Sequence, residues 1–437
     1  MPMDDPRKLL DDTPMRALQW GAVALCVLLN ALDGFDVLAI SFAAPGIAAE
    51  WGIDRAALGL VLSMELIGMA AGSVLLGQVA DRVGRRPTIL GCLMVMTIGM
   101  ALVPLAGDVV MLSGIRLFTG IGIGGMLACT NAMVAEYANA RNRGLTVAIM
   151  AAGYPLGVVI GGSAASALLA AGGWRDVFML GTVAAAILVP LAWWGLPEPI
   201  GSLIDRGGPR ALARTNATLV RMGHAPISTL PPPTAKAARL PIAALFRPEL
   251  AATTVLLTVA YFAHIMTFYF MLKWIPKIVV DLGYAPASAG GVLVWANIGG
   301  LLGAVVLGLA SRRLGPRRPM VVALAGSAAM VAWFGHGHRD IDGLRSVAAI
   351  AGFFTNAGVV GLYALIAQAF PTALRGTGTG LVIGVGRGGA ALGPIIAGAL
   401  FAGGGSLGVV AIGMAMGSVV ALVALLVLPQ RQPAGRL

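Results

Sequence analysis

Long apolar runs alternate with short polar segments along almost the whole chain. Each run is rich in Ala, Leu, Val and Gly and lasts roughly 20 residues, the length with which an α-helix crosses a bilayer. The runs lack the apolar–polar alternation of barrel strands. We therefore predict twelve membrane-spanning helices, near 18–45, 56–79, 88–107, 109–137, 144–171, 177–196, 251–275, 288–310, 319–336, 345–369, 377–402 and 407–428.

A single long polar stretch separates the sixth run from the seventh. It covers about residues 197–250 and contains TLPPPTAK at 229–236, a composition typical of a linker. The pattern predicts an all-α membrane protein with twelve transmembrane helices in two pseudo-symmetric six-helix bundles. We place the bundles at 1–196 and 251–437, joined by a cytoplasmic linker at 197–250.

Composition narrows the class of protein further. Of the 437 residues, 58% are hydrophobic and 11% are charged, whereas soluble proteins carry about 25% charged residues. The net charge of +11 lies in short clusters between apolar runs, without the basic stripe of a nucleic-acid-binding protein. The three cysteines lie inside apolar runs without metal-ligand spacing. We therefore expect no disulfide, no metal, no cofactor and no nucleic acid.

The distribution of Lys and Arg predicts the orientation. With a cytoplasmic N-terminus, the inner loops and tails hold 22 of the 30 basic residues and the outer ends hold six. Cytoplasmic loops carry such an excess. No small-residue cleavage site follows a short apolar core at the N-terminus. We therefore expect both termini in the cytoplasm and the first run to remain as a helix.

The two predicted bundles repeat each other in sequence. GQVADRVGRRP at 77–87 is echoed by GLASRRLGPRRP at 308–319, and GYPLGVVIGG at 153–162 aligns with GVGRGGAALGP at 384–394. The offset is 231 positions in both cases. Such parallel repeats are the architecture of transporters that work by alternating access.

These motifs also carry a family resemblance. GQVADRVGRRP and RLFTGIGIGG (116–125) resemble the major facilitator superfamily, over essentially the whole chain. Within it, LDGFD, AEYANARNRG (135–144), LPEP (196–199) and GVGRGGAALGP resemble the aromatic acid:proton symporter family. Two departures stand out: the family's Glu-Tyr-x-Pro reads EYANA here, and Arg312 replaces the acid that Asp81 provides in the first half.

The resemblance implies a function. It implies a monomer in a bacterial inner membrane that imports a small aromatic carboxylic acid of the benzoate, hydroxybenzoate or protocatechuate type together with protons. Importers of non-aromatic organic acids and drug:proton antiporters are the alternatives within transport. The fifth-span signature of drug:proton antiporters ends in Gly-Pro, followed two residues later by a pair of glycines. The fifth run here reads GYPLGVVIGG, in which Pro155 comes before Gly157, so it does not match that signature. A sensor or an enzyme is set aside, because no signalling domain, phosphate loop or nucleophile motif is present.

Ionisable residues inside the apolar runs are candidates for function. Asp33 and Asp36 lie three residues apart on one helix face beside Gly34, and like charges this close cannot both ionise easily. We expect them to carry the proton; the alternative is a structural salt bridge with Arg116 or Arg387. Glu65 has the weakest case.

Substrate contacts are predicted from residue type. Arg116 or Arg387 could hold a carboxylate through the guanidinium fork, and His264 could bind a ring hydroxyl, relay a proton or simply pack. Aromatic residues could line a pocket for a planar ring, foremost the FYF segment at 268–270. The predicted substrate-binding residues are Arg116, His264, Arg387, Phe35, Phe268, Tyr269, Trp295 and Tyr363.

The resemblance also implies a gate at the loop between the second and third spans. In the superfamily this loop latches the outward-facing state. We expect Asp81 to be stabilised by a helix N-terminus and by a cation such as Arg143. The predicted gating residues are Gly77, Asp81, Arg82, Gly84, Arg85, Arg86, Glu136 and Arg143.

Overall fold

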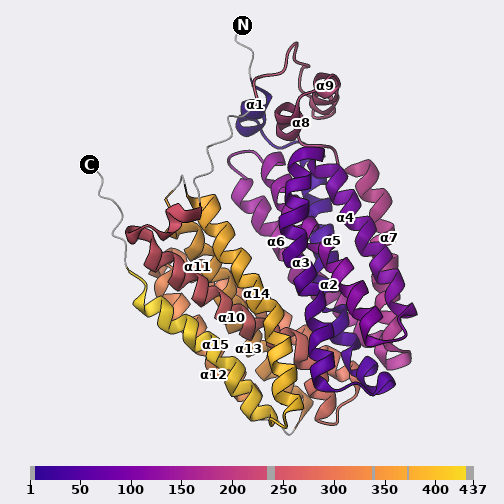
Figure 1. Cartoon of the computed structure of the whole chain (residues 1–437). Coiled ribbons are helices and arrows are strands. Elements are labelled where there is room, and N and C mark those ends of the chain that lie inside the picture. The colour runs from indigo at the N-terminus through magenta and orange to yellow at the C-terminus, as the bar shows by residue number, and fades with distance from the viewer. Residues whose placement is uncertain (1–4, 234–241, 337–339, 372–373, 430–437) are drawn as a thin grey trace. The chain divides into compact units, whose positions relative to one another are not determined.

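The chain folds into helices, with no strand among the residues that the computed structural model describes, 5–233, 242–336, 340–371 and 374–429 (Figure 1). The helices that take up the apolar runs begin and end close to the predicted positions. Their bounds are α2 (Ala17–Trp51), α3 (Arg55–Val83), α4 (Arg85–Leu102), α5 (Val109–Tyr137), α6 (Arg143–Ala171), α7 (Trp174–Gly195), α10 (Pro248–Asp281), α11 (Pro286–Leu314), α12 (Arg317–Phe334), α13 (Ile341–Ala369), α14 (Arg375–Ala402) and α15 (Leu407–Val427).

The predicted all-α fold is confirmed. Within the described residues, eleven of these helices are long and apolar enough to span a membrane. The remaining predicted span, the ninth along the chain, forms α12, which has 18 residues and begins with Arg317 and Arg318. It packs against α13 and α15.

Short helices occupy the predicted linker and the N-terminal segment. They are α1 (Pro6–Asp12), α8 (Ile200–Arg206), α9 (Ala211–Arg221) and the 3₁₀ turn η2 (Ile242–Phe246), with a further 3₁₀ turn η1 (Val103–Leu105) after α4. Figure 1 shows α1, α8 and α9 together at one end of the bundle that α2–α7 form. Arg7 Nη1 of α1 lies 3.3 Å from Asp205 Oδ1 of α8. The predicted linker is therefore partly helical.

Two compact units make up the chain. The first contains Met1–Ala39, Met64–Leu168 and Gly172–Ala235, and the second contains Ile40–Ser63, Leu169–Ala171 and Lys236–Leu437. Asp33, Asp36, Glu65 and Arg116 belong to the first unit. Arg387 and His264 belong to the second.

Glycines bring helix backbones into contact inside the first unit. A Cβ on Gly68 would lie 2.2 Å from Leu117 O, and one on Gly72 would lie 2.1 Å from Ile121 O. No larger residue fits at these two α3 positions while α5 stays where it is. Close approach through small residues four apart is a common way for helices to associate in membranes.

The second unit repeats this arrangement 231 residues later. Gly299 and Gly303 of α11 are the counterparts of Gly68 and Gly72. A Cβ on them would lie 1.8 Å from Ala349 O and 2.1 Å from Phe353 O of α13. The sequence repeat therefore corresponds to a repeat in helix packing.

Candidate functional site

A buried ion-pair cluster lies inside the first unit, on three helices. The α5 helix begins after Asp108, whose carboxylate accepts the Met111 N–H at 2.7 Å. Two turns further on, Arg116 points into the bundle and is fully buried. Its Nη1 donates to Asp36 Oδ1 at 2.9 Å, and its Nη2 donates to the Asp36 backbone oxygen, also at 2.9 Å. The same Nη2 forms an ion pair with Glu65 Oε1 of α3.

The two terminal nitrogens of the guanidinium are therefore engaged within the protein, whereas Nε has no hydrogen-bond partner among the described residues. Two carboxylates share the guanidinium, and the ring of Phe178 covers it at 5.5 Å from the ring centroid. Removing one partner of such a buried pair costs about 3–5 kcal/mol, because a charge is left uncompensated. The salt bridge that the sequence left as an alternative is present between Arg116 and Asp36. Both terminal nitrogens of Arg116 contact Asp36, and one of them also contacts Glu65.

Asp33 has a different environment, although it lies one turn before Asp36 on the same buried face. Its side chain is 1% exposed, and neither carboxyl oxygen has a hydrogen-bond partner among the described residues. An ionised carboxylate without partners in an apolar interior is very costly, so such a group takes up a proton instead. Among the described residues, Asp36 forms an ion pair with Arg116, and Asp33 forms none.

Gly34 explains why this part of α2 can be so closely packed. A Cβ at Gly34 would lie 2.2 Å from the backbone oxygen of Tyr154 in α6. From the other side, a Cβ at Gly157 would lie 1.8 Å from Ala31 O. The backbones of α2 and α6 therefore touch directly at the residue next to Asp33.

In the second unit, Arg387 lies beside a pair of tyrosines. The hydroxyl groups of Tyr261 (α10) and Tyr363 (α13) are 2.9 Å apart, and their rings are 5.4 Å apart. Gly386 makes room for the Tyr261 ring, because a Cβ there would lie 1.9 Å from it. Arg387 is the next residue of α14 after Gly386. The contact of Tyr261 with Gly386 therefore brings the tyrosine pair to the part of α14 that carries Arg387.

His264 is buried and held on both sides of its ring. Its Nδ1 lies 3.0 Å from Ser418 Oγ, and its Nε2 lies 2.9 Å from the backbone oxygen of Thr355. Ser418 Oγ in turn lies 2.8 Å from Ser327 Oγ. This network ties α10 to α12, α13 and α15. Of the roles left open by the sequence, the geometry favours packing over substrate contact.

The predicted aromatic contacts fall into several environments. Phe35 is buried against Gly161 of α6 and Gly181 of α7. Phe268 and Tyr269 pack edge to face at 5.3 Å between ring centroids. Trp295 of α11 is 47% exposed and Tyr363 of α13 is 41% exposed. Among these, Tyr363 forms the hydroxyl pair with Tyr261.

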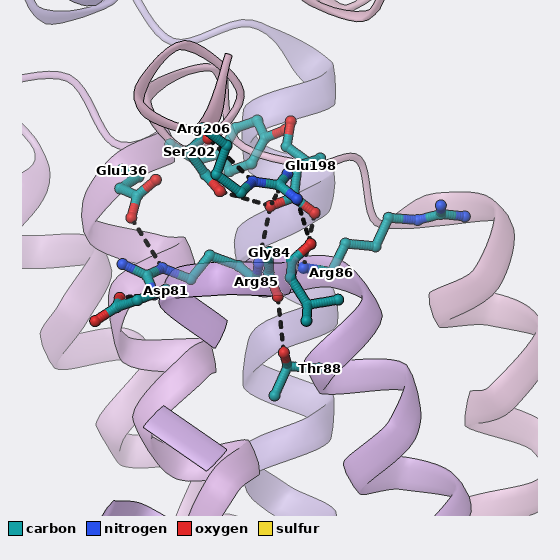
Figure 2. A network of polar contacts seen from close by, with 11 residues as sticks. Asp81, Gly84, Arg85, Arg86, Thr88, Glu136, Glu198, Ser202 and Arg206 are labelled. Carbon is teal, nitrogen blue, oxygen red and sulfur yellow. Dashed lines mark hydrogen bonds and ion pairs between the residues drawn. The ribbon is translucent and has the colours of Figure 1, made fainter. Parts of the chain in front are cut away.

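Several of the predicted gating residues lie in a polar network around the start of α4 (Figure 2), namely Asp81, Gly84, Arg85, Arg86 and Glu136. Asp81 Oδ1 accepts from Arg85 Nη1 at 2.6 Å, and Arg85 Nε donates to Glu136 Oε1 at 3.2 Å. Arg85 is therefore the cation that pairs with Asp81. The expectation that Arg143 would do so is wrong, because Arg143 forms an ion pair with Asp11. Three helices, α3, α4 and α5, meet at this network.

Glu198, from the LPEP segment, organises the other half of the network in Figure 2. It accepts the backbone N–H groups of Arg85 at 2.8 Å and Arg86 at 3.1 Å, the free donors of the first turn of α4. Ser202 Oγ donates to Glu198 at 2.8 Å, and Arg206 lies 3.2 Å away. A negative charge at a helix N-terminus is stabilising.

Gly84 is required at this turn for two reasons. Its φ is +121°, a conformation that side chains disfavour. A Cβ would also lie 2.7 Å from Glu198 Oε1. By contrast, a Cβ on Gly77 would meet nothing within 4 Å, and Arg82 is exposed.

The second unit repeats only part of this network. Arg86 Nη2 donates to Trp193 O at 2.6 Å, and Arg317 Nη2 donates to Leu425 O at 3.1 Å, 231 and 232 residues further along. Arg312 stands where Asp81 stands in the first unit. The arginine-to-helix-end contact is duplicated, whereas Asp81 has no acidic counterpart.

Three residues matter here that the sequence did not select. Glu198 lay in a quoted motif, but its partners are more than a hundred positions away. Tyr261 looked like any aromatic residue in a span. Glu65 ranks lowest among the ionisable residues that the sequence offers as functional candidates. Its charge inside an apolar run is the signal that could have ranked it higher. Within the described residues, no three metal-ligating side chains come together.

Comparison with known proteins places the chain. The sequence profile of the Major Facilitator Superfamily matches residues 26–338 and 257–437. The chain is 32% identical to the gallate transporter of Pseudomonas putida, with 91% of this chain and 90% of the relative covered. It is 31% identical to the 4-hydroxybenzoate transporter PcaK of Pseudomonas putida, with 89% and 88% covered. It is also 31% identical to the 3-(3-hydroxy-phenyl)propionate transporter of Escherichia coli K12, with 94% of each covered.

The fold agrees with this placement. The crystal structure of a D-xylose-proton symporter superposes with a TM-score of 0.70 at 17% identity, covering 94% of this chain and 97% of the other. These relatives are transporters, and this multi-pass membrane protein is a transporter and not an enzyme. The chain belongs to the Major Facilitator Superfamily and, within it, to the aromatic acid:proton symporter family.

Proposed function

We propose that the chain imports a small aromatic carboxylic acid together with protons, by alternating access. The observation that carries the proton part is Asp33, a buried acid without a hydrogen-bond partner among the described residues. A group of this kind can hold a proton where water is excluded and release it where water enters. The names of relatives that cover most of the chain support the aromatic substrate.

Arg387 and the tyrosine pair support a binding site for the substrate. A guanidinium matches the geometry of a carboxylate and can donate two parallel hydrogen bonds to it. Tyrosine hydroxyls both donate and accept, so Tyr261 and Tyr363 suit a phenolic ring substituent. We assign the carboxylate to Arg387 and not to Arg116, because Asp36 and Glu65 already occupy Arg116.

We infer that the gate lies at the Asp81–Arg85–Glu136 network. Its ion pairs are partly exposed and join α3, α4 and α5 at one end of the first unit. Exposed pairs are individually weak, typically below about 1 kcal/mol. They are therefore suited to open and re-form during transport, unlike the buried pair of Arg116.

We infer a bacterial inner-membrane location, with both termini cytoplasmic and the protein working as a monomer. The excess of Lys and Arg in alternate loops supports this orientation. It also places α1, α8, α9 and the Glu198 network on the cytoplasmic side. C-terminal fusions would test it: a green fluorescent protein fusion should fluoresce, and an alkaline phosphatase fusion should be inactive.

Uptake into proteoliposomes tests the function. With an acidic outside and an alkaline inside, the purified protein should accumulate labelled 4-hydroxybenzoate or protocatechuate, and a protonophore should abolish accumulation. Asp33→Asn should lose accumulation but retain exchange of labelled for unlabelled substrate. Muconate serves as the non-aromatic control. Driven uptake of muconate without uptake of any benzoate would reject an aromatic substrate.

A further inference from the structure

Glu65 takes part in the buried cluster, although no motif selects it. Its carboxylate forms an ion pair with Nη2 of Arg116, the nitrogen that also donates to the Asp36 backbone. All three side chains are fully buried. The backbones of α3 and α5 touch here, since a Cβ on Gly120 would lie 2.1 Å from Glu65 O. The position of Glu65 is therefore fixed by the helix contact itself.

The cluster contains more acid than base. Three buried carboxyl groups, those of Asp33, Asp36 and Glu65, surround one guanidinium. Coulombic repulsion acts between Asp33 and both other acids. Within the first unit, the charged or titratable groups around Asp33 are Asp36 on its own helix, Glu65 on α3, Cys92 on α4, Arg116 on α5 and Tyr154 on α6, whose backbone packs on Gly34.

We propose that Glu65 is a positioning residue of the proton-coupling centre: it shares Arg116 with Asp36, so that the charge of Arg116 is balanced without Asp33. The inference rests on the proposed function, since it concerns the same proton. With Asp36 as its one carboxylate partner, Arg116 would form a neutral pair beside Asp33. With Asp36 and Glu65 both ionised, the group carries one net negative charge, which favours the protonated form of Asp33.

The sign of the effect follows from electrostatics. Replacing Glu65 by a neutral residue removes one negative charge and leaves Arg116 with Asp36 alone. Both changes favour an ionised Asp33. Proton loading then needs a higher proton concentration, so the midpoint of proton-driven uptake should move to lower external pH. We expect a shift of about one pH unit, equivalent to about tenfold in proton concentration.

The test compares uptake against pH in proteoliposomes of the full-length protein. Glu65→Gln and Glu65→Met both remove the charge, and the second is an apolar residue of similar length. Both should shift the uptake midpoint to lower pH while substrate exchange at saturating substrate stays within about twofold. Glu65→Asp keeps the charge and should restore the wild-type midpoint. Thr119→Val, at a buried site one turn from Arg116, is the matched control and should leave the midpoint unchanged.

Each outcome decides the proposal. An unchanged midpoint in a charge-removing variant that still exchanges substrate overturns it. So does failure of both charge-removing variants to insert while Glu65→Asp inserts, since Glu65 would then be purely structural. Absence of aromatic acid transport in the wild-type protein is a separate result, and it rejects the proposed function itself.

Discussion

The carboxylate of Glu198 accepts the backbone N–H of Arg85, 113 residues earlier in the chain, at 2.8 Å. A residue that closes the sixth predicted span thus caps the helix that forms the third. This single contact ties the LPEP segment to the loop that the family resemblance identifies as a gate.

Removing this cap should weaken the first unit. Glu198→Ala leaves the Arg85 and Arg86 N–H groups and the Arg206 guanidinium without their acceptor, and loss of a capping carboxylate costs about 1–2 kcal/mol. The apparent melting temperature in detergent should fall by a few degrees. The control is Asp342→Ala, which breaks an exposed pair with Arg345 and should change stability by less than about 0.5 kcal/mol. Equal melting temperatures for the two variants would contradict the capping role.

Gly34 should not tolerate a side chain. In Gly34→Ala the new Cβ would lie 2.2 Å from Tyr154 O, so α2 and α6 must separate, at a cost of about 1–3 kcal/mol. The amount of folded protein recovered from membranes, measured by size-exclusion chromatography, should drop. Gly91→Ala in α4 meets nothing within 4 Å and should be recovered at the wild-type level. A normal yield of Gly34→Ala would show that the helix contact can relax.

The tyrosine pair should discriminate between ring substituents. Tyr363→Phe removes the hydroxyl group 2.9 Å from that of Tyr261. Loss of one neutral hydrogen bond corresponds to about 0.5–1.5 kcal/mol, or a rise in KM of about two- to tenfold for 4-hydroxybenzoate. Unsubstituted benzoate should be affected less. Tyr284→Phe, outside the helices, controls for loss of a hydroxyl elsewhere, and equal effects of Tyr363→Phe on the two substrates would exclude ring recognition.

His264 should matter for stability and not for coupling. His264→Asn removes ring contacts to Ser418 and Thr355, and a buried group left unsatisfied costs about 1–3 kcal/mol. Thermal stability should therefore fall, whereas the pH midpoint of uptake should stay at the wild-type value. A shifted midpoint in folded His264→Asn would instead make His264 part of the proton pathway.

The helices could be predicted from the sequence because their signal is local. Each apolar run is long enough to predict a membrane-spanning helix by itself. The 231-residue repeat predicts that the two halves of the chain have equivalent folds. The ends were harder: α2 continues to Trp51 through Pro45, six residues beyond the predicted limit. Proline is tolerated there because neighbouring helices in a bundle can satisfy the freed backbone groups.

Partners across helices could be predicted only in part. The sequence indicated that Asp36 or Asp33 could pair with Arg116. It did not indicate that Asp36 does so while the Asp33 carboxyl group has no hydrogen-bond partner among the described residues. The choice depends on the rotation of α2 against α5, which the contact of Gly34 with α6 helps to set. Glu65 and Glu198 depend in the same way on contacts between distant segments.

The glycine contacts of α3 with α5 and of α11 with α13 have a mechanical consequence. Where two backbones touch directly, no side chain lies between them that could change rotamer and allow the helices to slide. Each pair of helices, α3 with α5 and α11 with α13, should therefore move as one rigid body through the transport cycle. Bending would then be confined to helices that lack such contacts along part of their length, and hinge-altering substitutions should be sought there.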